Sequence, residues 1–460
     1  MPLSIESGPS YEIFRDIVGK VCRLSPYRRA KYDNREYEGT LKMRPKVILQ
    51  LYPMLPADGE EGRRRARPVG RDADLYQRVL FEWLDIVKAA DEMGVWGAST
   101  IEHHLHSEGY EVGPNPGILN AWWAGQVKHL HVGALGYVMA TQDPIRVAEE
   151  TAILDHITRG KYFVGFARGY QSRWTNILGQ FSHTVATVSD GSADDLKNRD
   201  IFEERVAMVL RCWEEDSVVL DGDYYQAPFP LDTGVQKYPA ARIASEAGGA
   251  GEIDAAGNVR RISVVPPTYK KRRPPIFVAT TRSDDSVRYC GRNGFIPTYF
   301  SKFDSIRKQA QLYVDEAAKH GERVTLGQRQ NIVRWPHIAS SMAECDRMVR
   351  DYDIDIYKNF YGPFFPQFPT DPNTDFVQNI KESGIFTVGT PDQVRDEWKR
   401  IYDEVPCEYI TLIYHFAQQP KESVLRELEL FMTNVVPHLD AASSAPTVGV
   451  AGAQGPGTRD

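Results

Sequence analysis

Between residues 46 and 436, short apolar runs alternate with longer segments whose apolar residues recur at helical spacing. The run 46–52 (KVILQLY) is short and almost wholly apolar, as expected of a strand buried on both faces. In 74–93 apolar residues recur every three or four positions, which is typical of an amphipathic helix, and Gly94 ends the segment as a C-terminal glycine should. A chain that repeats this unit is expected to form a parallel sheet covered by helices.

The whole pattern predicts about eight strands that alternate with helices, and therefore an α/β fold of the (β/α)₈ or TIM-barrel type. An open, doubly wound sheet is the alternative, but it usually carries a glycine-rich turn after its first strand, and 51–56 (LYPMLP) has no glycine. The strands are expected at 46–52, 95–101, 131–140, 162–167, 275–280, 294–299, 324–333 and 409–414. The principal helices are expected at 74–93, 115–129, 144–157, 202–213, 283–291, 305–319, 342–352, 391–402 and 423–436.

The barrel is expected to span residues 45–440 and to be interrupted twice. Residues 221–274 contain several turn signals and are interpreted as a hairpin excursion. Residues 360–388 are rich in Pro and Phe, which is typical of a lid over a barrel mouth. Residues 1–44 form an N-terminal extension with a helix at 11–21, placed at an oligomer interface, and the small, Gly-rich residues 441–460 are expected to be a disordered tail.

The composition excludes several classes of function. The chain has 460 residues, 42% of them hydrophobic and 25% charged, and its net charge of −7 argues against nucleic-acid binding. Five scattered cysteines form no CxxC pair, which argues against a structural zinc site or a disulfide framework and indicates a cytoplasmic protein. The first residues do not resemble a secretory signal, and no run of 18 apolar residues predicts a membrane span. The basic run 63–67 is interpreted as a solvated loop.

Catalytic residues of such barrels lie at the carboxyl ends of the strands, and the second expected strand ends in Glu102, His103 and His104. Neighbouring residues of a strand point to opposite sides, so His103 and His104 are unsuited to binding one metal ion. A histidine positioned by a carboxylate can instead act as an acid, a base or a hydrogen-bond donor. Ordinary polar loop residues remain the alternative interpretation.

Three further positions suit an anionic or flat ligand. The fourth strand ends in Arg168 and Gly169, which fits a phosphate, although a structural ion pair explains such an arginine equally well. The hydroxyls of Thr280, Thr281 and Ser283 precede a helix, where they either bind phosphate or cap the helix.

The third strand contains Leu135 and Gly136 at its middle. Glycine in a strand often marks the close approach of another group, such as a flat ring, and ordinary packing is the more common reason.

Together these positions resemble the bacterial-luciferase-like flavin monooxygenases over about residues 45–440. The 132–169 block is the most specific part of the resemblance, because a chance match to so long an ordered pattern is improbable. The matching motifs are EHH (102–104), VGALGYVMATQDPIRVAEETAILDHITRGKYFVGFARG (132–169), FEER (202–205) followed by Trp213, DGDYY (221–225), PPIFVATT (274–281) and VGTPDQV (388–394).

The resemblance implies that FMN binds at the carboxyl ends of the barrel strands and that His103 is catalytic, with Glu102 in support. Leu135 and Gly136 would then lie against the isoalloxazine ring. Arg168, Gly169, Arg199, Thr280, Thr281 and Ser283 would surround the phosphate. Luciferases have a reactive cysteine just before the arginine of the fourth strand, where this chain has Ala167, so light emission is not implied.

The predicted function is that of a two-component monooxygenase that receives reduced FMN from a separate flavin reductase and uses dioxygen. No second nucleotide-binding motif is recognised in the chain. A deazaflavin-dependent dehydrogenase on the same barrel and a non-catalytic flavin-binding protein are the alternatives. The substrate is expected to be small and apolar or ring-containing, and the protein to be a homodimer or a higher homo-oligomer. The predicted substrate pocket contains Tyr52, Met54, Trp122, Trp123 and Phe364.

Overall fold

A computed structural model describes residues 43–187, 189–280, 283–365 and 368–442. Most of the predicted N-terminal extension, including the helix at 11–21, lies outside the described residues, as do residues 443–460. Residues 441 and 442, predicted to belong to the disordered tail, are held by backbone hydrogen bonds from Ala441 to Met43 and from Ala442 to Pro406. The described structure therefore includes two residues beyond the predicted boundary.

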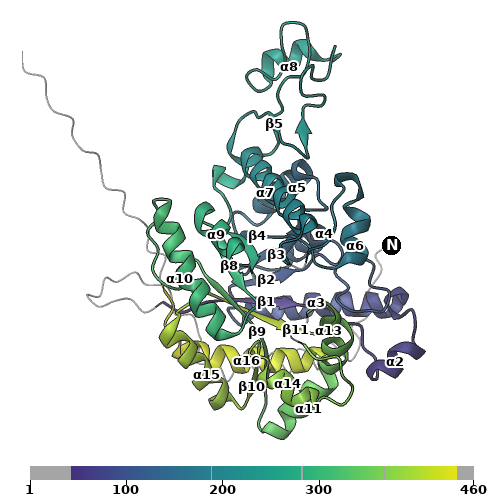
Figure 1. The fold of residues 1–460 in the computed structure, drawn as a ribbon, viewed down its shortest axis with the longest axis vertical. Helices are drawn as coiled ribbons and strands as arrows, with labels where there is room; N and C mark the ends of the chain where they lie inside the picture. The colour runs from purple at the N-terminus through teal and green to yellow at the C-terminus, as the bar shows by residue number, and fades with distance from the viewer. Residues whose placement is uncertain (1–42, 188, 281–282, 366–367, 443–460) are drawn as a thin grey trace, which may run out of the picture. The chain divides into compact units, whose positions relative to one another are not determined.

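Eight parallel strands close into a barrel, which confirms the predicted TIM-barrel fold (Figure 1). Each strand pairs with the next around the ring, and β11 pairs with β1, so the open doubly wound sheet is excluded. A further strand, β10 (Phe386–Gly389), pairs with β9 outside the ring. In order around the barrel the strands are β1 (Lys46–Leu51), β2 (Gly97–Thr100), β3 (His131–Val138), β4 (Tyr162–Ala167), β7 (Ile276–Thr280), β8 (Ile296–Tyr299), β9 (Asn331–Ile338) and β11 (Tyr409–Tyr414).

Long helices cover the outside of the barrel (Figure 1). Several begin at capping residues that the sequence contains: the Asp72 side chain accepts from Leu75 N, and Thr390 forms a capping box with Gln393. These helices are α3 (Ala73–Glu92), α4 (Pro116–Ala124), α5 (Pro144–Ile157), α7 (Ala193–Glu214), α9 (Asp284–Asn293), α10 (Phe303–Lys319), α11 (Met342–Tyr352), α15 (Pro391–Glu404) and α16 (Lys421–Asn434).

Shorter helices lie in the connections. They are α2 (Gly59–Arg65), η1 (Val69–Arg71), α6 (Ser172–Leu178), η2 (Gln180–Ser182), α8 (Ala241–Ala247), η3 (Tyr269–Lys271), α12 (Ile354–Ile356), the π-helix η4 (Tyr357–Tyr361), α13 (Gly362–Phe364), α14 (Phe376–Glu382) and η5 (Val436–His438). Over the described residues, no helix combines the length and the apolar character needed to cross a lipid bilayer.

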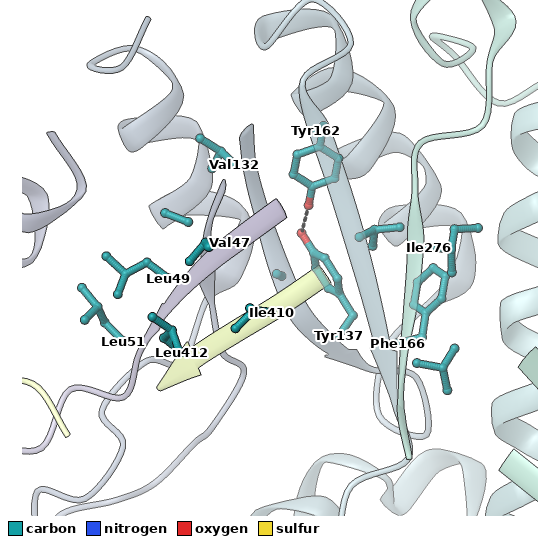
Figure 2. Packing of buried hydrophobic residues seen from close by; sticks show 14 of the residues in the cluster. Val47, Leu49, Leu51, Val132, Tyr137, Tyr162, Phe166, Ile276, Ile410 and Leu412 are labelled. Atoms are coloured by element: carbon teal, nitrogen blue, oxygen red, sulfur yellow. Dashed lines mark hydrogen bonds between the residues drawn. The ribbon is translucent and has the colours of Figure 1, made fainter. Parts of the chain in front are cut away.

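The strands bury both of their faces, as their apolar runs predict. Val47, Leu49 and Leu51 of β1 belong to the large cluster that includes the surrounding helices, and Figure 2 shows them beside residues of β11. Ile48 belongs instead to a smaller cluster with Phe163, which fills the inside of the barrel. The alternation therefore leaves the carboxyl ends of the strands as the place where side chains can surround a ligand.

The two predicted insertions have different structures. The first contains a short antiparallel pair, β5 (Leu220–Asp221) with β6 (Gln226–Ala227), and the helix α8, and its ends are joined by a bridge between Val218 and Ile262. The second contains short helical segments and a strand: residues 360–388 include the end of η4, then α13, α14 and most of β10. It brings several aromatic side chains to the barrel mouth.

The strand predicted at 324–333 is wrong in position, because β9 begins at Asn331 and ends at Ile338. Asn331, Arg334 and His337 are all buried within this strand. They interrupt the apolar run that usually signals a buried strand, so the sequence pattern alone did not extend it far enough.

Candidate active site

A cavity of about 220 Å³ lies at the carboxyl ends of the barrel strands. Its walls divide into a polar group and an aromatic group. The polar lining residues are Glu102, His103, Arg168, Thr187, Ser189, Ser283 and Ser286. The aromatic ones are Tyr52, Tyr170, Trp174, Phe300, Trp335, Tyr361, Phe364, Phe365 and Phe368. A cavity with one charged wall and one aromatic wall suits a ligand that has both an anionic and an apolar part.

His103 lies between these two walls, in the loop that follows β2. Its Nδ1 lies 2.7 Å from Oε2 of Glu111, a carboxylate that is fully buried. The rings of Tyr52 and Tyr170 contact the imidazole edge-on, with centroids 6.0 and 6.5 Å away. This arrangement presents the other ring nitrogen, Nε2, as the atom available for proton transfer.

Glu111 is held in place by three side chains. Besides His103, the Tyr361 hydroxyl donates to its Oε1 at 2.9 Å, and Gln171 Nε2 donates to its Oε2 at 3.2 Å. Burial acts to raise the pKa of Glu111, but the charge of His103, the hydrogen bond with His103 and the hydrogen bond from Tyr361 lower it overall. The carboxylate is therefore ionised and can stabilise a protonated His103.

Glu102 lines the cavity but does not contact His103, so its predicted role in support of that residue is corrected. Its Oε2 accepts from the backbone N of Val138 at 2.7 Å, and its Oε1 lies 3.1 Å from Nε2 of His104. Glu102 thus joins the end of β2 to the end of β3. Over the described residues, no group of three or more His, Cys, Asp or Glu side chains is arranged to hold a metal ion.

Leu135 and Gly136 both line the cavity, at a point where the pairing of β3 with β4 shifts register. A Cβ on Gly136 would lie 2.3 Å from the backbone of Gly165, so the close approach of β4 requires glycine here. The packing explanation therefore accounts for the glycine, and Leu135 supplies the side chain that faces the cavity. The next residue, Tyr137, is not among the lining residues and belongs to the large buried cluster. Its hydroxyl lies 3.2 Å from that of Tyr162 (Figure 2).

Arg168 forms the ion pair that is the alternative to phosphate binding. Its Nη2 donates to Asp195 Oδ1 at 2.5 Å, and its Nε donates to Asn198 Oδ1 at 3.1 Å. However, Nη1 is buried and has no hydrogen-bond partner among the described residues. Burial and the nearby charge of Arg199 lower the pKa of Arg168, so an anion at Nη1 would be favoured.

Arg199 and Ser283 lie together, because Arg199 Nη2 donates to Ser283 Oγ at 3.1 Å. Ser283 precedes α9 without capping it through its side chain. Thr280 does not line the cavity; its buried hydroxyl donates to the carbonyl of Thr298. Thr281 lies outside the described residues. Gly169 has a φ of +83°, and a Cβ there would lie 2.6 Å from Val138 Cγ1, so it allows the chain to turn beside Arg168.

Residues 67–406 match the family of luciferase-like monooxygenases. The chain belongs to this family. This luciferase-like monooxygenase is 30% identical over 400 residues to an alkanal monooxygenase alpha chain of Photorhabdus luminescens, and the alignment covers 79% of this chain and 92% of that protein. It is 21% identical over 346 residues to 3,6-diketocamphane 1,6-monooxygenase of Pseudomonas putida, with 71% and 84% of the two chains covered.

Two solved structures show the same fold. One is the oxygenating constituent of 3,6-diketocamphane monooxygenase from Pseudomonas putida in complex with FMN, a type II Baeyer-Villiger monooxygenase, with a TM-score of 0.64 and 20% identity over 86% of this chain and 99% of that one. The other is an F420-dependent secondary alcohol dehydrogenase, with a TM-score of 0.56 and 11% identity over 86% of this luciferase-like monooxygenase and 100% of that chain. The fold is thus shared by proteins with different reactions.

Of the five residues predicted to line a substrate pocket, two line this cavity and three lie elsewhere. Tyr52 and Phe364 line the cavity of this luciferase-like monooxygenase. Met54, Trp122 and Trp123 are not among its lining residues. Met54 is fully buried, and Trp123 packs against Trp83 in the core between helices and barrel. Trp122 contacts Phe81 on neighbouring α3.

Sequence reasoning missed Glu111 and Tyr361. Glu111 is eight positions from His103, and its sequence signal is the surrounding segment 109–113 (GYEVG), in which Gly109, with a φ of +86°, allows the chain to fold back. Tyr361 lies within the predicted aromatic lid but carries no motif of its own. Both residues are recognised only when the loop and the lid are placed against the barrel mouth.

Proposed function

We propose that this luciferase-like monooxygenase is the oxygenase component of a two-component system. It takes reduced FMN from a separate flavin reductase and uses dioxygen to oxygenate a small organic substrate that is apolar or contains a ring. The observation that supports this best is the His103–Glu111 pair, which stands between a charged wall and an aromatic wall of one cavity. The charged wall suits the phosphate of FMN, and the aromatic wall suits an apolar substrate.

The residues present fit FMN. The Nη1 of Arg168, which has no partner among the described residues, would hold the phosphate together with Arg199 and Ser283 at the start of α9. Leu135, at the register shift of β3, would lie against the isoalloxazine ring. Gly169 allows the chain to turn close to the phosphate side of the cavity. Contacts within the chain hold Arg168 against Asn198 and Asp195, and Arg199 against Ser283.

Reduced FMN supplies the electrons that activate dioxygen, and the chain supplies the proton and a dry cavity. A protonated His103, stabilised by Glu111, can donate the proton on Nε2 toward the cavity. Phe364 and Phe365 both contact Tyr170, with ring centroids 5.3 and 5.1 Å away, and exclude water from the aromatic wall. Because the described side chains of this wall are aromatic, it favours an apolar or ring-containing substrate.

The proposal is tested by the fate of labelled dioxygen. The purified protein, given reduced FMN through a generic flavin reductase and ¹⁸O₂, should place one ¹⁸O atom into a member of a panel of cyclic ketones, aromatic compounds and thioethers. Hydride transfer to a deazaflavin without ¹⁸O incorporation would establish the dehydrogenase instead. If the protein binds flavin but catalyses neither reaction, it is a non-catalytic flavin-binding protein.

Two neighbouring histidines provide a matched pair of variants. His103→Gln should lower the yield of oxygenated product by about 100-fold, the scale of a lost general acid, with reduced-FMN affinity nearly unchanged. His104→Gln should retain most of the yield, because His104 contacts Glu102 and Trp174 and does not line the cavity. Equal losses in both variants would show that His103 is structural.

The proposed partner and location follow the same reasoning. A flavin reductase is needed because the reduced cofactor must come from elsewhere. The free thiols of Cys212, Cys290, Cys345 and Cys407 are buried, which suits a reducing, cytoplasmic compartment. A homodimer or a higher homo-oligomer remains part of the proposal, and light scattering of the purified protein would measure its mass.

A further inference from the structure

Behind His103, a row of buried polar side chains extends from the cavity wall into the protein interior. It begins at Glu111, passes through Tyr361 of η4 and His415 just after β11, and continues to Asp353 and to His337 of β9. Each of these side chains is less than one-tenth exposed. Buried polar groups are costly unless they are paired, so an uninterrupted row of them calls for an explanation beyond packing.

Every neighbouring pair in this row lies at hydrogen-bond distance. Tyr361 Oη lies 2.9 Å from Glu111 Oε1 and 3.0 Å from His415 Nε2. His415 Nδ1 lies 2.7 Å from Asp353 Oδ1, and Asp353 Oδ2 lies 2.6 Å from His337 Nε2. The row therefore links the His103–Glu111 pair to a second, fully buried histidine–carboxylate cluster.

With Asp353 ionised, as its lowered pKa indicates, counting protons along the row gives two arrangements that satisfy every contact. The Tyr361 hydroxyl has one proton and two partners. If it donates to an ionised Glu111, then His415 must donate from Nε2 to Tyr361 and from Nδ1 to Asp353, and is a cation. If Tyr361 donates instead to a neutral His415, then Glu111 must be protonated and donate to the Tyr361 oxygen.

These two arrangements differ by the shift of two protons, each across one hydrogen bond. In the first shift the Tyr361 proton moves to Glu111 Oε1, and in the second the His415 Nε2 proton moves to Tyr361 Oη. The net change transfers one positive charge away from His415 and neutralises Glu111. No atom other than hydrogen moves, so the exchange needs no rearrangement of the fold.

We propose that Tyr361 and His415 form a proton shuttle that compensates the charge of Glu111 when His103 gives up its proton. As His103 donates from Nε2 into the cavity, the buried Glu111 carboxylate loses its positive partner. One proton then passes from His415 through Tyr361 to Glu111, and the cavity acceptor holds the proton that His103 released. Both Tyr361 and His415 are positioning residues in this role, which rests on the proposed function of His103.

The surrounding charges suit this shuttle. Although burial opposes it, the charges of Asp353 and Glu427 raise the pKa of His337 to about 10, so His337 remains a cation. Although burial acts in the opposite direction, the same contact with His337 lowers the pKa of Asp353, which is then an ionised acceptor for His415 Nδ1. On the cavity side, burial followed by the charge of His103 lowers the pKa of His106, so His106 does not add a second cation beside Glu111.

The first test uses the protein without flavin, so its outcome does not depend on the proposed reaction. The chain has 11 histidines. With ¹⁵N-labelled histidine, NMR distinguishes rings protonated on both nitrogens from those protonated on one, and His415→Gln assigns the signal of His415. We expect His415 to carry both protons in the native protein and to become neutral in Tyr361→Phe, which removes the acceptor of its Nε2 proton.

A matched control is available on the same helical segment. Tyr357 of η4 is also buried, and its hydroxyl donates to Asn379 rather than to the row. Tyr357→Phe should leave the His415 signal unchanged. A native His415 protonated on Nδ1 alone, or one that keeps the same protonation in Tyr361→Phe, would overturn the proposal.

The second test uses the loaded enzyme once its substrate is known. Tyr361→Phe keeps the aromatic ring that lines the cavity, so KM should remain within about twofold while kcat falls by about tenfold or more, within the range of a proton-transfer contribution. In mixtures of H₂O and D₂O, the native rate should depend on the deuterium fraction in a curved manner, because several protons move together, and the dependence in Tyr361→Phe should be linear.

His415→Gln provides a second variant if Tyr361→Phe folds poorly, since glutamine can donate to Tyr361 but cannot release a proton. It should lower kcat to the same extent, and the double variant should be no slower than either single variant. Independent, multiplying losses would overturn the shuttle. If oxygenation itself fails in the native protein while NMR shows the coupling, then the proposed reaction is wrong, and only the coupled protonation of Tyr361 and His415 is established.

Discussion

At the scale of single residues, Arg168 combines a structural contact with a free binding group. Three of its contacts, to Asp195, Asn198 and Thr187, hold the loop after β4 against the start of α7. The remaining Nη1 is buried without a partner among the described residues. The planar guanidinium makes this division possible, because its five N–H groups point in fixed, separate directions.

Replacing Arg168 by lysine should therefore show whether FMN binding depends on the positive charge alone or also on the directed N–H groups of the guanidinium. In Arg168→Lys the ammonium group keeps the positive charge, but the donor toward the cavity is lost, and FMN should bind about 10- to 100-fold more weakly, or about 1–3 kcal/mol. Titration followed by flavin fluorescence measures the change. Arg211→Lys, in an exposed ion pair with Glu215, is the control and should bind FMN normally. Unchanged affinity in Arg168→Lys would remove Arg168 from the phosphate site.

The sequence predicted His103 as a catalytic residue but did not predict the carboxylate that contacts it. The strand-end rule and the family motif both led to His103, because both depend on short-range pattern. The choice of carboxylate depends on the path of the loop, and Glu111, with φ of +48°, turns back toward His103 where Glu102 does not. The aromatic wall was predicted only in part for the same reason. Phe364 lies in a Phe-rich loop that the sequence pattern shows. Trp122 and Trp123 lie on a helix, and only the packing of that helix decides that they face the core and not the cavity.

At the scale of elements, the segment 354–365 covers the cavity, and Arg63 is one of the residues that anchor it. Arg63 Nε pairs with Asp355 Oδ2 at 2.8 Å, and its Nη1 donates to the carbonyls of Leu55 and Glu108. Both side chains of this ion pair are less than one-tenth exposed. The basic run 63–67, interpreted from the sequence as a solvated loop, is instead mostly helix α2 with one buried member, because only position 63 faces the segment.

Removing this anchor should loosen the cover without unfolding the barrel. Arg63→Met keeps the apolar stem but leaves Asp355 buried without its cation, a change that costs about 3–5 kcal/mol in buried pairs. Hydrogen exchange in 354–365 should become at least about tenfold faster, and more hydrogen peroxide should form per product because water enters the cavity. Arg65→Met, on the same helix and exposed, should do neither. Normal exchange in Arg63→Met would contradict the anchoring role.

At the scale of the whole molecule, the repeating strand–helix pattern was sufficient to predict a closed barrel. Each strand's apolar run and each helix's spacing give the same answer, and their number fits eight units. The pattern cannot show which hydrogen-bond partners the buried polar residues of a strand will find. The misplacement of β9 and the missed buried row have this common cause, since Asn331 bonds to Thr411 on the neighbouring strand β11 and His337 bonds to Asp353 after helix α11.

The buried pair of His337 and Asp353 should make the stability of the barrel depend on pH on the alkaline side. The folded protein keeps the His337 proton until about pH 10, whereas an unfolded histidine releases it near pH 6.5. The stabilisation is therefore complete below about pH 6.5 and is lost as the pH rises to about 10. Within this window the free energy of unfolding should fall by up to ~1.4 kcal/mol per pH unit.

Urea unfolding at pH 7, 8, 9 and 10 measures this slope, and comparison with His337→Gln isolates it, because other groups that titrate in this range are common to both proteins. The stability difference between native protein and variant should shrink as the pH rises. His320→Gln, at an exposed histidine, should keep the native slope. Parallel slopes for native protein and His337→Gln would mean that Asp353 faces a neutral imidazole, and the fixed cation on which the proton shuttle depends would then be absent.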